Sequence, residues 1–146
     1  MRNLPEIPIQ TFGATISAEL GVSEERRRAL RAEGRFEPSP VHVTLLIDTG
    51  ATGSWIRPAY MNQLGLSPRS WFEVETVDGV EGEQPGYEVS LILGGVGTLN
   101  TKRFETLIGG CEFENTPHDG LLGRNILKFL HVAWNGPSAS VRVQYE

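Results

Sequence analysis

Cysteine, long apolar runs and positive charge are all scarce in this sequence. Cys111 is the single cysteine among 146 residues, so no disulfide can form within the chain and nothing points to an oxidising compartment. No apolar stretch approaches the roughly 20 residues that a membrane-spanning helix needs. The start of the chain also lacks the apolar segment of a signal peptide. We therefore expect a cytoplasmic protein without a membrane segment.

Charge and histidine content exclude two further kinds of partner. The chain carries 13 Lys and Arg against 18 Asp and Glu, and its net charge of -5 disfavours binding to the phosphates of nucleic acid. Its three histidines, His42, His118 and His131, are too scattered to give metal-ligand spacing with the one cysteine. The sequence thus predicts no nucleic-acid partner, no metal and no cofactor.

Turn residues and short alternating apolar segments are what the sequence has in plenty. Its 17 Gly and 9 Pro favour many turns over long helices. Apolar residues alternate over 12–20 and again over 41–47, with the period of a half-buried strand. Ser23 can cap a short solvated helix over 24–31, which Gly34 would end. The length suits one domain, 1–146.

The rest of the chain continues this mainly β pattern. We expect a short helix over 59–64, a hairpin with a Gly-rich tip over 73–90, a strand over 104–108, a short helix over 124–129 and two last strands joined at Asn135-Gly136. The predicted class is all-β with one or two short helices. Within it we distinguish an N-terminal strand and helix (1–40), a core (41–134) and a C-terminal strand (135–146). The three tryptophans, Trp55, Trp71 and Trp134, are expected in the core or in a pocket wall.

A carboxylate stands at the end of the almost wholly apolar strand 41–47. Residues 45–53 read LLIDTGATG. An ionised carboxylate in a dry place costs on the order of several kcal/mol unless it is hydrogen-bonded, paired or protonated. Thr49 and Gly50 can supply a hydroxyl, N–H groups and a tight turn. Because Asp-Thr-Gly also occurs in ordinary turns, the context must decide whether Asp48 is catalytic.

A second motif far downstream supplies that context. Residues 118–127 read HDGLLGRNIL, two apolar residues followed by Gly, Arg and Asn before a short helix. The two motifs, with a Gly-rich hairpin between them, resemble the retropepsins, the aspartic peptidases of retroviruses and their cellular and bacterial relatives. The resemblance covers residues 41–129.

The resemblance implies a closed β-barrel of the acid-protease type, with one lobe per chain, and a role for each matched residue. Asp48 would be the catalytic aspartate. Three residues would support its loop: Thr49, Gly50 and Ala51. Four would pack behind that loop: Leu121, Leu122, Gly123 and Arg124. Four more would form a flap over a bound peptide: Val77, Asp78, Gly79 and Val80.

Two regions depart from the viral pattern. Viral members often have an acidic residue four positions after the catalytic aspartate, where it pairs with the arginine matched here by Arg124. Thr52 occupies that position in this chain, so Arg124 must find another acceptor. The N-terminal region, 1–40, has no clear counterpart in the minimal viral enzymes.

A single Asp-Thr-Gly motif implies a pair of chains. Aspartic peptidase chemistry uses two carboxylates that share one proton: the ionised group draws a proton from water, and the protonated group donates to the scissile carbonyl. We therefore expect a homodimeric aspartic endopeptidase that acts on peptides or proteins, with a second Asp48 supplied by a two-fold related copy. Ala51 lacks the hydroxyl that many two-lobed relatives have there, which predicts a mildly acidic optimum.

Two alternatives remain open at this point. Asp119 could supply the second carboxylate within one chain, although no Thr or Ser follows it and a loop aspartate is the simpler interpretation. The chain could also be a catalytically silent retropepsin-like dimerisation or peptide-binding module, because a fold does not guarantee activity. Replacing Asp48 by Asn would separate an enzyme, which would lose cleavage, from a binding module.

Overall fold

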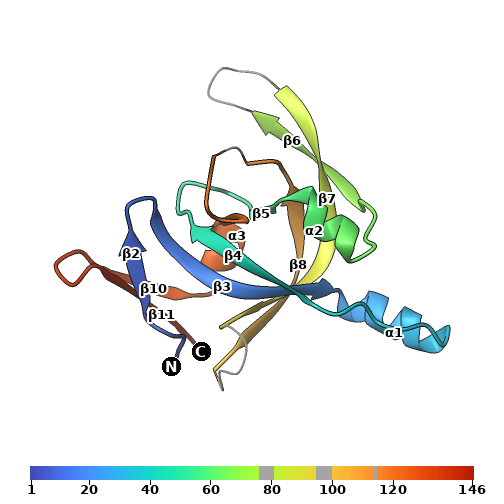
Figure 1. Ribbon diagram of the computed structural model, residues 1–146, viewed down its shortest axis with the longest axis horizontal. Coiled ribbons are helices and arrows are strands. Elements are labelled where there is room, and N and C mark those ends of the chain that lie inside the picture. Colours follow the sequence, from blue (N-terminus) through green and yellow to red (C-terminus); the bar gives the residue numbers. More distant parts are fainter. Residues whose placement is uncertain (76–80, 95–99, 114) are drawn as a thin grey trace.

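Strands make up most of the fold, and the helices of the described residues are short (Figure 1). The computed structural model describes residues 1–75, 81–94, 100–113 and 115–146. The helices in these ranges are α1 (Glu24–Ala32), α2 (Pro58–Gln63) and α3 (Arg124–Leu127). The strands are β1 (Arg2–Asn3), β2 (Ile7–Gln10), β3 (Gly13–Val22), β4 (Val41–Ile47), β5 (Trp55–Ile56), β6 (Ser70–Glu75), β7 (Glu81–Leu93), β8 (Lys102–Gly110), β9 (Gly120–Leu122), β10 (His131–Asn135) and β11 (Ser140–Tyr145). The all-β prediction is confirmed.

Six of the strands close into a barrel. They follow one another in the order β3, β4, β9, β5, β8, β7, and β7 pairs with β3 again to close the ring. The ten residues of β3 are long enough to pair with β4 along one part and with β7 along another. Alternate side chains of β3, from Ala14 to Leu20, are almost wholly buried, as their period predicts. The apolar core therefore fills the barrel.

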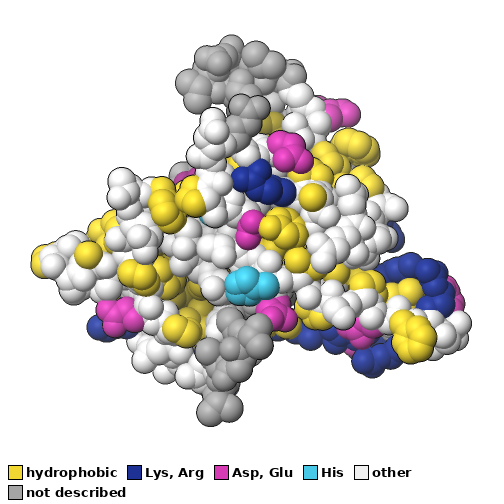
Figure 2. All heavy atoms as spheres, in the orientation of Figure 1, with side chains coloured by type: hydrophobic (Ala, Val, Ile, Leu, Met, Phe, Trp, Pro, Cys, Tyr) yellow, Lys and Arg dark blue, Asp and Glu magenta, His cyan; other side chains and the backbone are white. Residues whose placement is uncertain are grey.

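Helix α1 projects from the barrel and is mostly solvated, as expected. Its N-cap is Ser23, whose hydroxyl accepts the Arg26 N–H at 3.1 Å. Leu30 is its one buried residue. Figure 2 shows Lys and Arg side chains gathered over this helix beside acidic ones. Arg27 is paired with Glu37 at 2.6 Å and with Glu24 at 3.2 Å, so these charges form local ion pairs.

The hairpin of β10 and β11 lies outside the barrel. β11 pairs with β1 and β2 on one side and with β10 on the other. All five residues of β10 are exposed, and in the described ranges β10 pairs with β11 alone. Trp134 is 61% exposed and Val132 is 37% exposed. The hairpin therefore presents an open, partly apolar strand edge.

Membrane insertion through a helix finds no support in this fold. Over the described residues, every helix is too short and too polar to cross a bilayer.

Candidate active site

Asp48 follows the last residue of β4, where that strand runs parallel to β9. Its N–H donates to the Leu122 carbonyl at 3.0 Å, and its own carbonyl accepts the Ala51 N–H at 3.2 Å. The carboxylate oxygen Oδ1 accepts the Gly50 N–H at 2.9 Å. The side chain is half-buried. Backbone groups of its own tight turn therefore orient this carboxylate at the surface of the barrel.

The start of α3 holds the loop that contains Asp48, residues 48–54. The Arg124 N–H donates to the Ala51 carbonyl at 2.8 Å, and the Asn125 N–H donates to the Thr52 carbonyl at 3.1 Å. The Gly123 N–H donates to the Ser54 hydroxyl at 2.9 Å. The first N–H groups of a helix have no partner within the helix. Here the loop supplies their acceptors, so the loop and α3 fix each other.

Arg124 finds acceptors in the same loop. Its guanidinium donates to the Thr49 carbonyl at 2.8 Å and to the Thr52 hydroxyl at 3.2 Å. Thr52 stands where viral relatives often have an acidic partner, and its hydroxyl now takes one of these hydrogen bonds. The expectation of a different acceptor for Arg124 is confirmed.

Gly123 is the point of closest approach between the loop and the segment behind it. A Cβ atom there would lie 2.0 Å from the Gly53 carbonyl oxygen and 2.9 Å from the Ala51 carbonyl oxygen. Only glycine avoids these backbone contacts. Leu122 beside it is completely buried, and Leu121 is half-buried. Leu122, Gly123 and Arg124 thus contact the loop, while Leu121 pairs with Leu46 and Trp55 on the neighbouring strands.

The predicted loop residues face solvent in part, and the predicted flap lies outside the described residues. Thr49 and Gly50 are exposed, and Ala51 is half-buried. In the described part of the chain the Thr49 hydroxyl has no hydrogen-bond partner. The predicted flap residues, Val77, Asp78, Gly79 and Val80, fall outside the described residues. The strands on either side of them, β6 and β7, form the expected antiparallel hairpin.

Asp119 is fully engaged as a structural residue. Its Oδ1 accepts the Tyr60 hydroxyl at 2.5 Å, and its Oδ2 accepts the Thr44 N–H at 2.8 Å. The hydrogen bond to this carboxylate, followed by burial, raises the pKa of Tyr60. Thr44 precedes Asp48 by four residues on the same strand, which corresponds to about 13 Å at the usual rise per residue. Asp119 is therefore not placed to share a proton with Asp48.

Arg57, which no sequence motif marks, holds the connection between β8 and β9. Its guanidinium donates to the carbonyl of Phe113, to the Thr116 hydroxyl at 3.0 Å and to the His118 carbonyl at 3.3 Å. His118 is buried, which lowers its pKa, and the charge of Arg57 lowers it further. An arginine after a short strand carries no pattern that predicts such a role.

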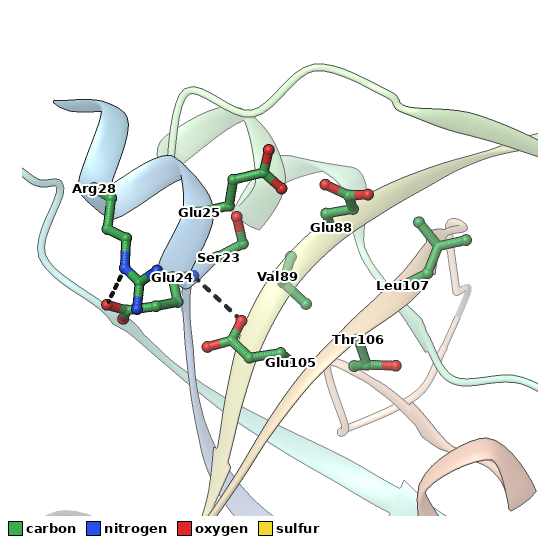
Figure 3. Close-up of a pocket in the computed structure, with 9 residues that line it drawn as sticks. All are labelled: Ser23, Glu24, Glu25, Arg28, Glu88, Val89, Glu105, Thr106 and Leu107. Carbon is green, nitrogen blue, oxygen red and sulfur yellow. Dashed lines mark hydrogen bonds and ion pairs between the residues drawn. The ribbon is translucent and has the colours of Figure 1, made fainter.

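A hollow of about 560 Å³ lies between α1 and strands β7 and β8, and none of the residues around Asp48 lines it (Figure 3). Four glutamates border it: Glu24, Glu25, Glu88 and Glu105. Burial would raise the pKa of Glu105, but hydrogen bonds from Ser90, the Glu24 N–H and Arg103 outweigh it and lower that pKa. Across the described ranges, no three or more His, Cys, Asp or Glu side chains are grouped to hold a metal ion.

Comparison with known proteins identifies the family and the fold. A family model described as Aspartyl protease matches residues 30–126. The crystal structure of a retropepsin-like aspartic protease from Rickettsia conorii is similar over 97% of this chain and 89% of that chain, with a TM-score of 0.57 and 15% sequence identity. No curated protein matches the chain. The family match covers more than half of the sequence and the structural match shows the fold, so the chain belongs to the aspartyl protease family and has the retropepsin-like fold.

Proposed function

We propose that the protein is an aspartic endopeptidase in which two Asp48 carboxylates, one from each subunit of a homodimer, activate the attacking water. The observation that carries this proposal is the setting of Asp48. Its Oδ1 is oriented by the Gly50 N–H, its loop is fixed to α3, and Asp119, the other candidate within the chain, is bonded to Thr44 and Tyr60 instead. The site of a single chain is therefore half of a catalytic pair.

The proposed reaction is a direct attack of water on the peptide carbonyl. Two carboxyl groups a few Å apart cannot both ionise, so the pair holds one proton. The ionised carboxylate takes a proton from water, and the protonated one donates to the carbonyl oxygen. Collapse of the tetrahedral intermediate then passes a proton to the leaving amine. The enzyme forms no covalent intermediate.

Each chain would contribute the same parts around the two-fold axis. The Gly50 N–H would keep one carboxylate oxygen oriented, and the exposed Thr49 hydroxyl is free to bond to the partner's loop, the role that the family resemblance implies. Two hairpins of β6 and β7 would cover the groove as flaps. We expect a peptide or protein substrate with hydrophobic residues on both sides of the cleaved bond.

The edge of β10 is the surface that we assign to the second copy. An exposed strand edge with apolar side chains invites another strand, and two antiparallel copies of one strand satisfy two-fold symmetry by themselves. Pairing centred on Ala133 would place Trp134 of one chain beside Val132 of the other. In the view of Figure 1, this hairpin and the end of β4 lie on the same side of the barrel.

The test is cleavage of a mixed peptide pool by the wild type and by Asp48→Asn at a series of enzyme concentrations. We expect Asp48→Asn to lose at least about 10³-fold in rate while it still dimerises, because it removes the acid and base. Wild-type specific activity should fall on dilution below the dimer dissociation constant. Specific activity that stays constant through that dilution would contradict the shared site.

Two further outcomes separate the alternatives. A silent binding module would show no cleavage with either protein and unchanged peptide binding after Asp48→Asn. For an enzyme with Ala51 beside Asp48, the rate should reach its maximum in the mildly acidic range. A rate that still rises below about pH 3 would contradict this part of the proposal.

A further inference from the structure

Ser54 is an unusual residue for the end of a surface loop, because its side chain is only 2% exposed. The other fully buried polar or charged side chains of the described ranges are Ser90 and His118, and both lie outside this loop. A buried hydroxyl is costly unless its donor and acceptor capacity is used. The hydrogen-bond partners of the Ser54 hydroxyl therefore indicate why a serine is buried at this position.

The Ser54 hydroxyl joins the loop to α3 through a side chain. It accepts the Gly123 N–H at 2.9 Å and donates to Asn125 Oδ1 at 2.7 Å. The N–H of Asn125 returns to the same loop at the Thr52 carbonyl. Asn125 thus contacts the loop through both its backbone and its side chain. Arg124 also bonds to the loop through its side chain, but it does so at the exposed Thr49 and Thr52, whereas the link through Ser54 is buried.

We propose that Ser54 and Asn125 act as a pair of positioning residues that hold the Asp48 loop in its reactive geometry. This proposal rests on the peptidase function proposed above. Neither side chain is charged, so the pair acts through geometry rather than through a field at the carboxylates. A displacement of about 1 Å at a reacting group can cost about 10²-fold in rate. The loop needs such precision because the two Asp48 carboxylates must lie close enough across the two-fold axis to share a proton.

Steady-state kinetics of single and double variants test the pair. We expect Ser54→Ala to lower kcat by about 10-fold to 100-fold, with KM changed by less than about 3-fold, because the groove remains while the loop loosens. Asn125→Ala should lower kcat in the same way. The double variant should fall no more than about 3-fold below Ser54→Ala alone, since both changes break one chain of hydrogen bonds.

Ser90 provides a matched control. It is 1% exposed, and its hydroxyl bonds to Glu105 at 2.5 Å and to Arg103 at 2.9 Å, away from Asp48. Ser90→Ala removes a buried, hydrogen-bonded hydroxyl as Ser54→Ala does, so both should lose stability. We expect Ser90→Ala to keep kcat within about 2-fold of the wild type. A lower kcat in Ser54→Ala alone would therefore report position rather than stability.

Two results would overturn the proposal: an equal kcat for Ser54→Ala and Ser90→Ala, or losses that multiply in the double variant. If Ser54→Ala does not fold, Asn125→Ala decides alone against Ser90→Ala, because Asn125 is half-exposed and its truncation is milder. Should Asp48→Asn abolish cleavage while these variants keep it, only the positioning role is lost. Cleavage that survives Asp48→Asn would instead contradict the proposed aspartic peptidase function itself.

Discussion

The loop 48–54 and the strand β10 are built in opposite ways. Backbone and side-chain groups of 122–125 bond to the loop at Asp48, Thr49, Ala51, Thr52 and Ser54. Every residue of β10 is exposed, and in the described part of the chain it has a neighbour on one side only. The chain thus holds the loop around Asp48 with its own groups and leaves the edge of β10 unpaired in the described part of the chain. This contrast is what a half-site that awaits a second copy should show.

Gly123→Ala should have the largest effect, because it disrupts the close packing between loop 48–54 and the segment behind it. Its Cβ would lie 2.0 Å from the Gly53 carbonyl oxygen, and backbone on both sides cannot yield cheaply. We expect a loss of at least about 3 kcal/mol in the free energy of unfolding, measured with urea. Gly82→Ala is the control, since no atom of the described residues lies within 4 Å of its Cβ position. Equal stability of the two variants would show that the loop can accommodate an added methyl group at Gly123 and would contradict this prediction.

Trp134→Glu tests the exposed edge of β10. A charge at position 134 would lie against Val132 of the other chain, buried without a partner, so the dimer dissociation constant should rise at least about 10-fold in sedimentation experiments. Activity should recover at high protein concentration. The control is Trp71→Glu, which changes an equally exposed tryptophan, also 61% exposed, on β6 at the other end of the sheet. Equal weakening by both would remove β10 as the assigned surface.

Tyr60→Phe sharpens the distinction between Asp48 and Asp119. It removes the hydroxyl that donates to Asp119 Oδ1, and we expect a loss of about 1 to 2 kcal/mol in unfolding free energy. The kcat should stay within about 2-fold, because Asp119 lies far from the reacting groups. Tyr87→Phe is the control: Tyr87 is buried, whereas Tyr60 is half-buried, and the Tyr87 hydroxyl has no hydrogen bond in the described ranges. A large loss of kcat in Tyr60→Phe would return Asp119 to consideration as a second carboxylate.

His118→Phe should have the smallest effect. Burial lowers the His118 pKa in the folded chain, so as pH falls through the ordinary histidine range the unfolded chain binds a proton that the folded chain does not. The free energy of unfolding should therefore decrease as pH falls from 7 to 5. His118→Phe should make this decrease shallower. An unchanged slope in His118→Phe would show that another group causes the acid sensitivity.

Local patterns in the sequence predicted much of this fold and part of the site. The alternation in β3 and β4, the Ser23 cap of α1 and the hairpin of β6 and β7 all depend on neighbouring residues, and all three are confirmed. The placement of Asp48 at the end of β4 also follows from the order of residues. These features need no knowledge of which distant segments meet.

Contacts between distant segments were beyond such patterns. The closure of the barrel by β3 and β7, the link from Ser54 to Asn125 and the hydrogen bonds of Arg57 each join residues far apart in the chain. We expected Trp71 and Trp134 in the core or in a pocket wall. Both lie outside the core and Trp134 lines a hollow, because an apolar residue on an edge strand has the same sequence pattern as a buried one. The burial of a side chain depends on which segment covers it.

Mixing wild-type chains with Asp48→Asn chains tests the central claim most directly. A fixed amount of wild type is equilibrated with increasing amounts of the variant, and cleavage is measured at each ratio. If the site needs Asp48 from both chains, mixed dimers are inactive, and an equal amount of variant should lower the activity to about half by random pairing. Activity that is unchanged by a large excess of dimerising variant would show that one Asp48 is enough, and would contradict this account.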